Sequence, residues 1–164
     1  MIDYVLILAI VAFGASVQTA LGMGLNLVAI PTLVLIDAAY APGPILVISA
    51  INGALSLRTT SATIERPEAA AMLFGLLVGT VVAIAILASL DTSGFRVAIG
   101  IVILIAVGLA WFGLSLPITR RMLVTTGSLA GVMGTIAGIH APPIVVQYQR
   151  ASADRLRGAV MLII

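Results

Sequence analysis

Long uncharged stretches dominate this sequence and decide what it can fold into. Five runs carry no acidic or basic side chain: residues 4–36, 38–57, 69–90, 97–119 and 122–149. Each run is about long enough for a helix to cross a bilayer, which takes about 20 residues. We therefore expect an all-α integral membrane protein, placed in the cell inner (plasma) membrane as a multi-pass chain with the lipid bilayer as its solvent.

The composition excludes several other classes of protein. The chain is 62% apolar and 9% charged, whereas a soluble domain is about 45–50% apolar and about 25% charged. Disorder would need low hydrophobicity and high charge. All eight positive residues are Arg, and they are spread over short loops with no block of basic residues, so no nucleic-acid partner is expected. There is no Cys, and neither a metal-ligand cluster nor a cofactor motif occurs, so we expect no metal and no cofactor.

Three segments predict plain spanning helices, at residues 44–62, 69–90 and 97–114. The other two runs predict broken ones. As a straight helix, 4–36 would be about 50 Å long, against about 30 Å of hydrocarbon, and it contains Gly22 and Pro31. Run 122–149 contains Gly138 followed by two adjacent prolines. Such residues interrupt helices, and irregular backbone survives in a membrane only where protein or water surrounds it.

The two broken runs resemble each other at an offset of 116 residues. Thr19 falls on Thr135, and Gly22 falls on Gly138. At the same offset, segment 41–48, where a helix is expected to begin, falls on 157–164. We therefore expect a single transmembrane domain over 1–164 with two repeats, one over about 4–114 and one over about 122–164. The second repeat looks truncated.

The distribution of Arg predicts how the repeats are related. If both broken runs are hairpins that return to their own side, seven Arg share one side and only Arg96 lies on the other; if both cross once, the split is even. Positive residues favour the cytoplasmic side, so the hairpin model is preferred. Three crossings separate the hairpins, which predicts inverted repeats, each opening with a broken or re-entrant helix pair.

The broken segments also carry a family resemblance. The run Gly22-Met23-Gly24-Leu25-Asn26 followed by Pro31, and the run Gly138-Ile139-His140-Ala141-Pro142-Pro143 followed by Tyr148, resemble the two glycine-rich motifs of the sulfite exporter TauE/SafE family. The resemblance covers most of the chain, from about residue 10 to the end. It implies a membrane permease for sulfite, sulfonates or related small organic anions. Family members usually have more glycines at these points, and Leu25, Asn26, His140 and Ala141 depart from that pattern.

Glycines at the breaks are the first candidate binding residues. Gly22, Gly24 and Gly138 would let backbone approach an anion, and a half-helix N-terminus nearby would offer free N–H groups and a positive dipole end. The competing interpretation is close helix packing. Packing is the preferred interpretation of three further small-residue pairs: Gly75-x-x-x-Gly79, Gly127-x-x-x-Gly131 and Gly134-x-x-x-Gly138.

Polar side chains in apolar runs are the second group of candidates. Gln18 and Asn26 can donate to an anion without carrying charge, or can join helices. His140 is the only ionisable residue within a broken element, and a residue of that kind is a functional hypothesis by default. Ser49 and Asn52 are the deepest members of a polar stripe that either lines a path or bonds to helix carbonyls.

These features predict a permease that exports or imports a small anion by alternating access around two Gly/Pro-broken helices. The family resemblance implies that the substrate is sulfite, a sulfonate or a related organosulfur or carboxylate anion. An anion channel and a non-transporting scaffold subunit are the alternatives, and a homo-oligomer is left open. No nucleophile–base pair or nucleophile elbow occurs, so the sequence does not predict an enzyme.

Overall fold

Every element that the structure describes is a helix. The computed structural model describes residues 2–21, 32, 47–48, 51, 64–111 and 115–163. Its helices are α1 (Ile2–Leu21), α4 (Arg66–Ala88), α5 (Thr92–Trp111), α6 (Arg120–Ala137), α7 (Ala141–Tyr148) and α8 (Ala153–Ile163). Within these ranges there is no strand, so the all-α prediction is confirmed for them. The predicted helix at 44–62 lies almost entirely outside the described residues, as does the predicted break after residue 21.

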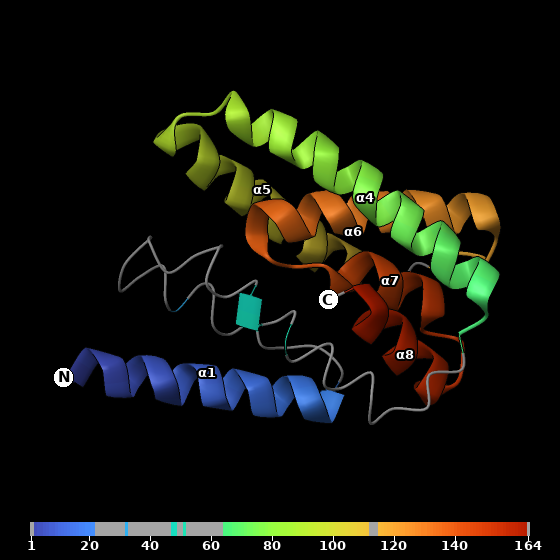
Figure 1. Cartoon of the computed structure of the whole chain (residues 1–164), viewed down its shortest axis with the longest axis horizontal. Helices are drawn as coiled ribbons and strands as arrows, with labels where there is room; N and C mark the ends of the chain where they lie inside the picture. Colours follow the sequence, from blue (N-terminus) through green and yellow to red (C-terminus); the bar gives the residue numbers. More distant parts are fainter. Residues whose placement is uncertain are drawn as a thin grey trace.

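Helices α4 and α5 are long and apolar enough to cross a membrane, and the chain runs along them in opposite directions on the two sides of a turn (Figure 1). Side chains cap the turn between them: the Ser89 hydroxyl donates to the Ile86 carbonyl (2.7 Å), and the Gly94 N–H donates to Asp91 Oδ1 (2.8 Å). Because Asp91 caps α5, this helix begins at Thr92, five residues before the predicted start at 97. The charged Arg96 therefore lies inside α5 rather than before it.

The outward faces of α4 and α5 are apolar. Leu77 and Val81 on α4 are each 65% exposed, and Leu104 on α5 is 73% exposed. In water such a surface would mark an interaction site or an aggregation hazard. Against lipid it is the expected surface, because the hydrocarbon core of a bilayer is itself apolar and favours Leu, Ile, Phe and Val.

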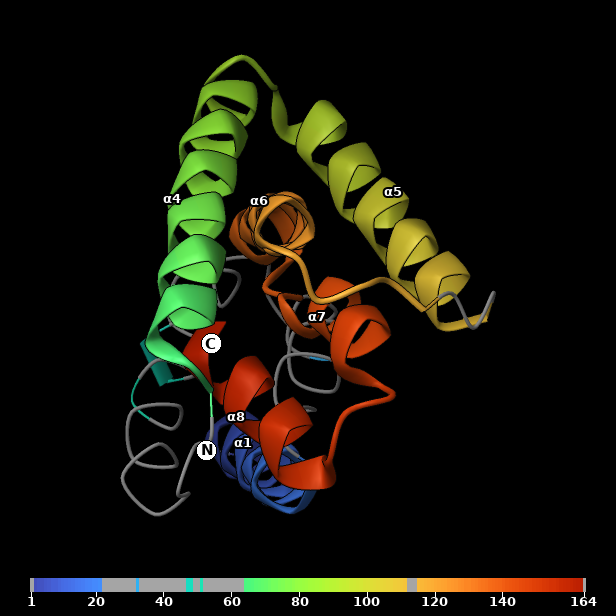
Figure 2. The ribbon, with the colours of Figure 1, turned by 90° about the vertical axis from the view of Figure 1, so that its right-hand side faces the viewer.

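Helix α6 occupies the centre of the described structure. Figure 2 shows it nearly end-on between α4 and α5, with α7 below it. Half of its 18 residues are buried, nine in all. Helix α1 lies on the opposite side of the molecule from α4 and α5 (Figures 1 and 2).

Glycines allow α4 and α6 to approach closely. A Cβ built on Gly75 would overlap the Val124 carbonyl oxygen, and one built on Gly79 would overlap that of Ser128. The relation is reciprocal, since a Cβ on Gly127 would overlap the Met72 carbonyl oxygen and one on Gly131 that of Leu76. The packing interpretation of these two glycine pairs is confirmed. Interfaces between membrane helices are enriched in small residues, because these let the backbones approach closely and pack.

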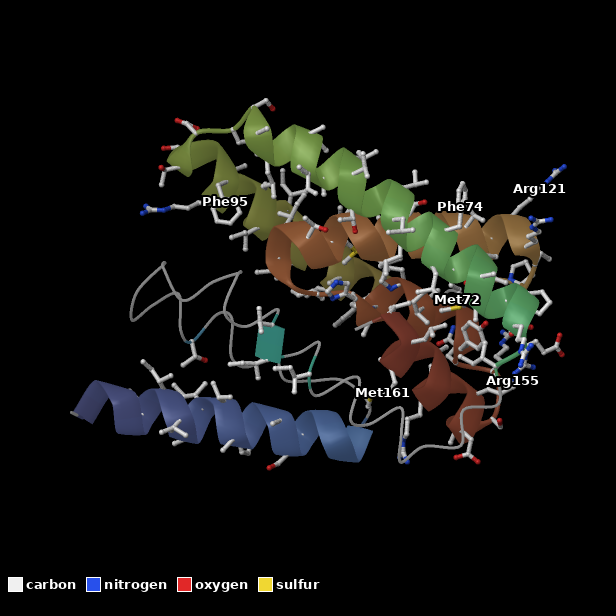
Figure 3. All side chains as sticks on the ribbon, viewed as in Figure 1. Met72, Phe74, Phe95, Arg121, Arg155 and Met161 are labelled. Carbon is white, nitrogen blue, oxygen red and sulfur yellow. The ribbon has the colours of Figure 1, made fainter. Side chains whose placement is uncertain are left out.

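Arginines collect at one end of the helices. This arginine-rich face comprises the described arginines at the starts of α4, α6 and α8 and in the turn before α8: Arg66, Arg120, Arg121, Arg150, Arg155 and Arg157. In Figure 3, Arg121 and Arg155 lie at this end, whereas Phe95, the neighbour of Arg96, lies at the other. Helix α8 begins at Ala153, four residues before the predicted start, because the Ser152 hydroxyl accepts the Arg155 N–H (3.4 Å).

Candidate functional site

The predicted break in run 122–149 is confirmed and occurs at Gly138. Helix α6 ends at Ala137, and Gly138 adopts a left-handed conformation with φ 69°. The N–H of Gly138 donates to the Gly134 carbonyl (2.7 Å), and the N–H of Ile139 to that of Met133 (3.4 Å). A left-handed residue just past a helix is the usual glycine cap. The chain then reverses and begins α7 at Ala141.

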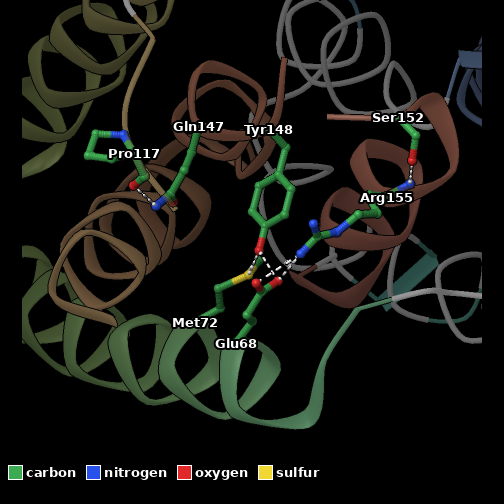
Figure 4. Close-up of polar contacts among 7 residues, drawn as sticks. All are labelled: Glu68, Met72, Pro117, Gln147, Tyr148, Ser152 and Arg155. Carbon is green, nitrogen blue, oxygen red and sulfur yellow. Dashed lines mark hydrogen bonds and ion pairs between the residues drawn. The ribbon is translucent and has the colours of Figure 1, made fainter. Parts of the chain in front are cut away.

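Helix α7 returns to the end at which α6 began. Gln147, near the end of α7, donates from Nε2 to the Pro117 carbonyl (3.0 Å), and Pro117 lies just before α6 (Figure 4). The Thr126 hydroxyl on α6 donates to Gln147 Oε1. Gln147 is only 3% exposed, so its amide is a buried link between α6 and α7. Helices α6 and α7 thus form a helical hairpin, with Gly138 at its tip.

His140 lies at the tip of this hairpin, beside Gly134. A Cβ on Gly134 would overlap the Cδ2 and Nε2 atoms of the imidazole, so the ring fills the space above that glycine. His140 Nδ1 is buried and has no hydrogen-bond partner among the described residues. The packing interpretation of Gly134 and Gly138 was therefore wrong. Gly134 makes room for the imidazole, and Gly138 turns the chain.

The start of α7 has fewer backbone N–H groups available to an anion than a half-helix N-terminus usually has. Pro142 and Pro143 occupy the second and third positions of the helix, where proline is well tolerated. Neither has an N–H, so among the first three residues only Ala141 has one. His140 adds an imidazole beside it. An anion at this tip would therefore be held by a side chain and a single backbone group.

The structure places the predicted site residues unequally. Gly138 and His140 are brought together at the hairpin tip. Gln18 belongs to α1, but its side chain is not among those described. The remaining candidates lie outside the described residues, so the structure does not place them beside His140: Gly22, Gly24, Asn26, Ser49 and Asn52.

A polar cluster that the sequence did not predict joins three helices at the arginine-rich face. Arg155 Nη2 on α8 donates to both carboxylate oxygens of Glu68 on α4, each at 2.8 Å (Figure 4). The hydroxyl of Tyr148 on α7 donates to Glu68 Oε2 (3.1 Å). Hydrogen bonding to Glu68, and then its charge, raise the pKa of the Arg155 guanidinium above its usual value. We call these three residues the Glu68 cluster.

Sequence reasoning missed Gln147 and the Glu68 cluster for different reasons. Gln147 is an amide in an apolar run, the same signal that singled out Asn26, and it could have been found. Glu68 and Arg155 are 87 residues apart and looked like ordinary loop charges. Nothing in their spacing indicates that they meet.

The turn at Gly138 provides a first testable prediction. Gly138→Ala should destabilise the fold by about 1–2 kcal/mol, because an L-residue pays that much in the left-handed region. Thermal denaturation in detergent, followed by gel filtration, measures the loss. Gly108→Ala on α5 is the matched control, since a Cβ there meets nothing within 4 Å. Equal melting temperatures for the two variants would contradict the assigned turn.

Comparison with known proteins identifies the family. The model of the family described as "Sulfite exporter TauE/SafE" matches residues 6–164, nearly the whole chain. No curated protein and no solved structure matches the chain. The family is one of transporters rather than enzymes, and the apolar helices α4 and α5 agree with a membrane location. The chain therefore belongs to the sulfite exporter TauE/SafE family.

Proposed function

We propose that this protein is a permease of the cell inner membrane that moves a small anion by alternating access around two broken helices. The substrate class is sulfite, a sulfonate or a related organosulfur or carboxylate anion. The observation that carries the proposal is the hairpin of α6 and α7, with its break at Gly138 and His140, in a chain of this family. Discontinuous helices of this kind commonly form the substrate sites of transporters.

The proposed architecture is one transmembrane domain with two inverted repeats. At the offset of 116, Leu21, the last described residue of α1, corresponds to Ala137, the last residue of α6. Helices α1 and α6 run in opposite directions in Figure 1. Both observations support a repeat related by inversion, in which α6 and α7 are a re-entrant pair.

The orientation follows from the arginines. Six of the seven described arginines lie at the arginine-rich face, and Arg96 lies at the opposite end. The excess of Lys and Arg marks the cytoplasmic side of membrane proteins. We place the arginine-rich face in the cytoplasm, so the tip of the hairpin at Gly138 points away from it, into the membrane.

The proposed site suits an anion for two reasons. His140 and the Ala141 N–H can both donate, and Gln18, Asn26, Ser49 and Asn52 are proposed to supply neutral donors from the first repeat. The five long apolar runs contain no Asp or Glu, so no carboxylate within them would repel an anion. The membrane potential could drive export, since each exported negative charge gains about 2.3 kcal/mol per 100 mV.

Flux measurements in liposomes test the proposal. The purified full chain is reconstituted, a potassium diffusion potential is applied, and efflux of sulfite is followed with sulfonates and chloride as comparators. We expect saturable sulfite or sulfonate flux. His140→Ala and Asn26→Ala should each lower it about tenfold, the value of one hydrogen bond to a charged group.

Controls separate the competing functions. Thr125→Ala removes an exposed hydroxyl from the same hairpin and should leave flux unchanged. Flux that rises linearly with concentration and far exceeds carrier rates would identify a channel instead. Absence of flux for every anion tested, from protein that elutes as a folded species, would overturn the proposal and favour a scaffold.

A further inference from the structure

We propose that the Glu68 cluster is a gate on the arginine-rich face, which holds α7 and α8 against α4 and has to break in each transport cycle. This inference rests on the proposed function, because alternating access requires that each side of the protein close and open in turn. The three members come from three helices, α4, α7 and α8. Their side chains point toward one another in Figure 4.

Burial makes the contact more than a surface ion pair. The Tyr148 side chain is completely buried, and the Glu68 side chain is 15% exposed while that of Arg155 is 32% exposed. Exposed ion pairs contribute little because water screens them. Here the carboxylate is largely withdrawn from water and accepts charge-assisted hydrogen bonds, which are stronger than neutral ones. The cluster therefore holds the three helix ends together.

The geometry of the Glu68 cluster allows its hydrogen bonds to be replaced by bonds to water or to another anion. A guanidinium binds a carboxylate most tightly through two nitrogens in a fork. In the Glu68 cluster Arg155 uses Nη2 alone toward both oxygens, and its Nε is buried with no partner among the described residues. Arg155 lies close to solvent, so water or another anion can take over its bonds when the helices separate.

The helices on the two sides of the Glu68 cluster, α4 on one side and α7 with α8 on the other, are joined to α6 in different ways. Helix α4 is joined to α6 by the glycine contacts described above, which extend from Met72 to Thr80 in the middle of α4. Helix α7 is joined to α6 through Gln147, the next-to-last residue of α7, at the arginine-rich end of the hairpin. Movement of the α7–α8 unit away from α4 would break the Glu68 cluster, together with the Gln147 bonds to Thr126 and Pro117, and open the protein at the arginine-rich face. The Gly138 turn at the far end of α7 would serve as the hinge.

Cysteine accessibility tests the gate directly. The chain contains no Cys, so a single introduced Cys reports alone. Ala71 is 6% exposed and lies three residues after Glu68, whereas Ala83 is fully buried farther along α4. Labelling of Ala71→Cys with a membrane-impermeant maleimide, in vesicles of both orientations, should be slow and should rise roughly tenfold when Glu68→Gln removes the charge. Ala83→Cys should stay unlabelled in both backgrounds.

Charge exchange separates a gate from a simple loss of stability. Glu68→Arg should raise the labelling of Ala71→Cys, and adding Arg155→Glu should lower it again. Unchanged labelling of Ala71→Cys in Glu68→Gln, with Ala83→Cys protected, would overturn the gate. Equal labelling at both positions would mean that the Glu68 variant unfolds. The milder variant Arg155→Lys, which keeps the charge, then decides the question. Intermediate labelling at Ala71→Cys alone would support the gate, and any other pattern would reject it.

The outcome does not depend on flux. If the unmodified protein transports no anion while the labelling follows the expected pattern, the proposed function fails and the contact remains as a conformational latch. If the protein transports sulfite and labelling does not change, transport stands and the gate is rejected. Together the two measurements assign any failure to one proposal.

Discussion

Gly79→Ala should destabilise the protein by about 3 kcal/mol, at the upper end of the cost of overpacking. The added Cβ would fall on the backbone of Ser128, with its Cα at 2.9 Å and its carbonyl oxygen closer still. Backbone on both sides cannot move as a flexible side chain does, so α4 and α6 would have to separate along their whole contact. Gly79→Leu should leave little folded protein. Thermal denaturation in detergent, followed by gel filtration, measures both effects.

Two glycines on α5 supply matched controls for this prediction. A Cβ on Gly100 or Gly108 meets nothing within 4 Å. Because alanine favours a helix by up to about 1 kcal/mol over glycine, Gly100→Ala should be neutral or slightly stabilising. A Gly79→Ala protein that melts with the Gly100→Ala protein would show that the α4–α6 crossing is not held as described.

The contrast between glycine pairs shows how far spacing predicts packing. The pairs beginning at Gly75 and Gly127 have the spacing of a packing motif and do pack, because they lie on facing stretches of α4 and α6. The pair beginning at Gly134 has the same spacing and does something else, since the second glycine falls at the helix end. Spacing alone carries no information on where a helix stops, so the sequence could not separate these cases.

The sequence predicted where α4 and α5 lie, but not the residue at which a helix begins. Uncharged runs located α4 and α5 because charge is expensive in hydrocarbon. The ends depend on caps. Asp91 begins α5 before Arg96, the charge that had been used as a boundary, and Ser152 begins α8 before the start that the repeat offset predicted. The break at Gly138 was predictable from the glycine and the prolines that follow it.

The contacts that hold the hairpin and the cluster were beyond sequence reasoning. They join residues that are distant in the chain, such as Glu68 with Tyr148 and Pro117 with Gln147. One sequence carries no record of which buried polar groups satisfy one another. Physical reasoning states only that each buried group needs a partner. For His140 Nδ1 that need is unmet among the described residues, which is why it remains the strongest candidate for a substrate contact.

Gln147→Leu should destabilise the protein by about 3 kcal/mol and splay the hairpin. The leucine keeps a similar volume but loses both hydrogen bonds of a side chain that is 3% exposed. A buried group left without its partner costs about 1–3 kcal/mol. Here the Pro117 carbonyl loses its donor, whereas the Thr126 hydroxyl keeps its bond to the Met122 carbonyl (2.8 Å). Thermal denaturation measures the stability, and protease digestion of the 115–119 segment measures how far α7 has detached.

A second substitution separates the amide bond from general packing. Thr126→Val removes the hydroxyl and keeps the shape, so its cost should be contained within that of Gln147→Leu. The double variant should then be about as stable as Gln147→Leu alone, because the bond between Thr126 and Gln147 is already lost in that single variant. Additive losses would mean that Thr126 and Gln147 act independently. In that case the return of α7 to the base of α6 would rest on apolar contacts, and α7 could move without breaking a polar bond.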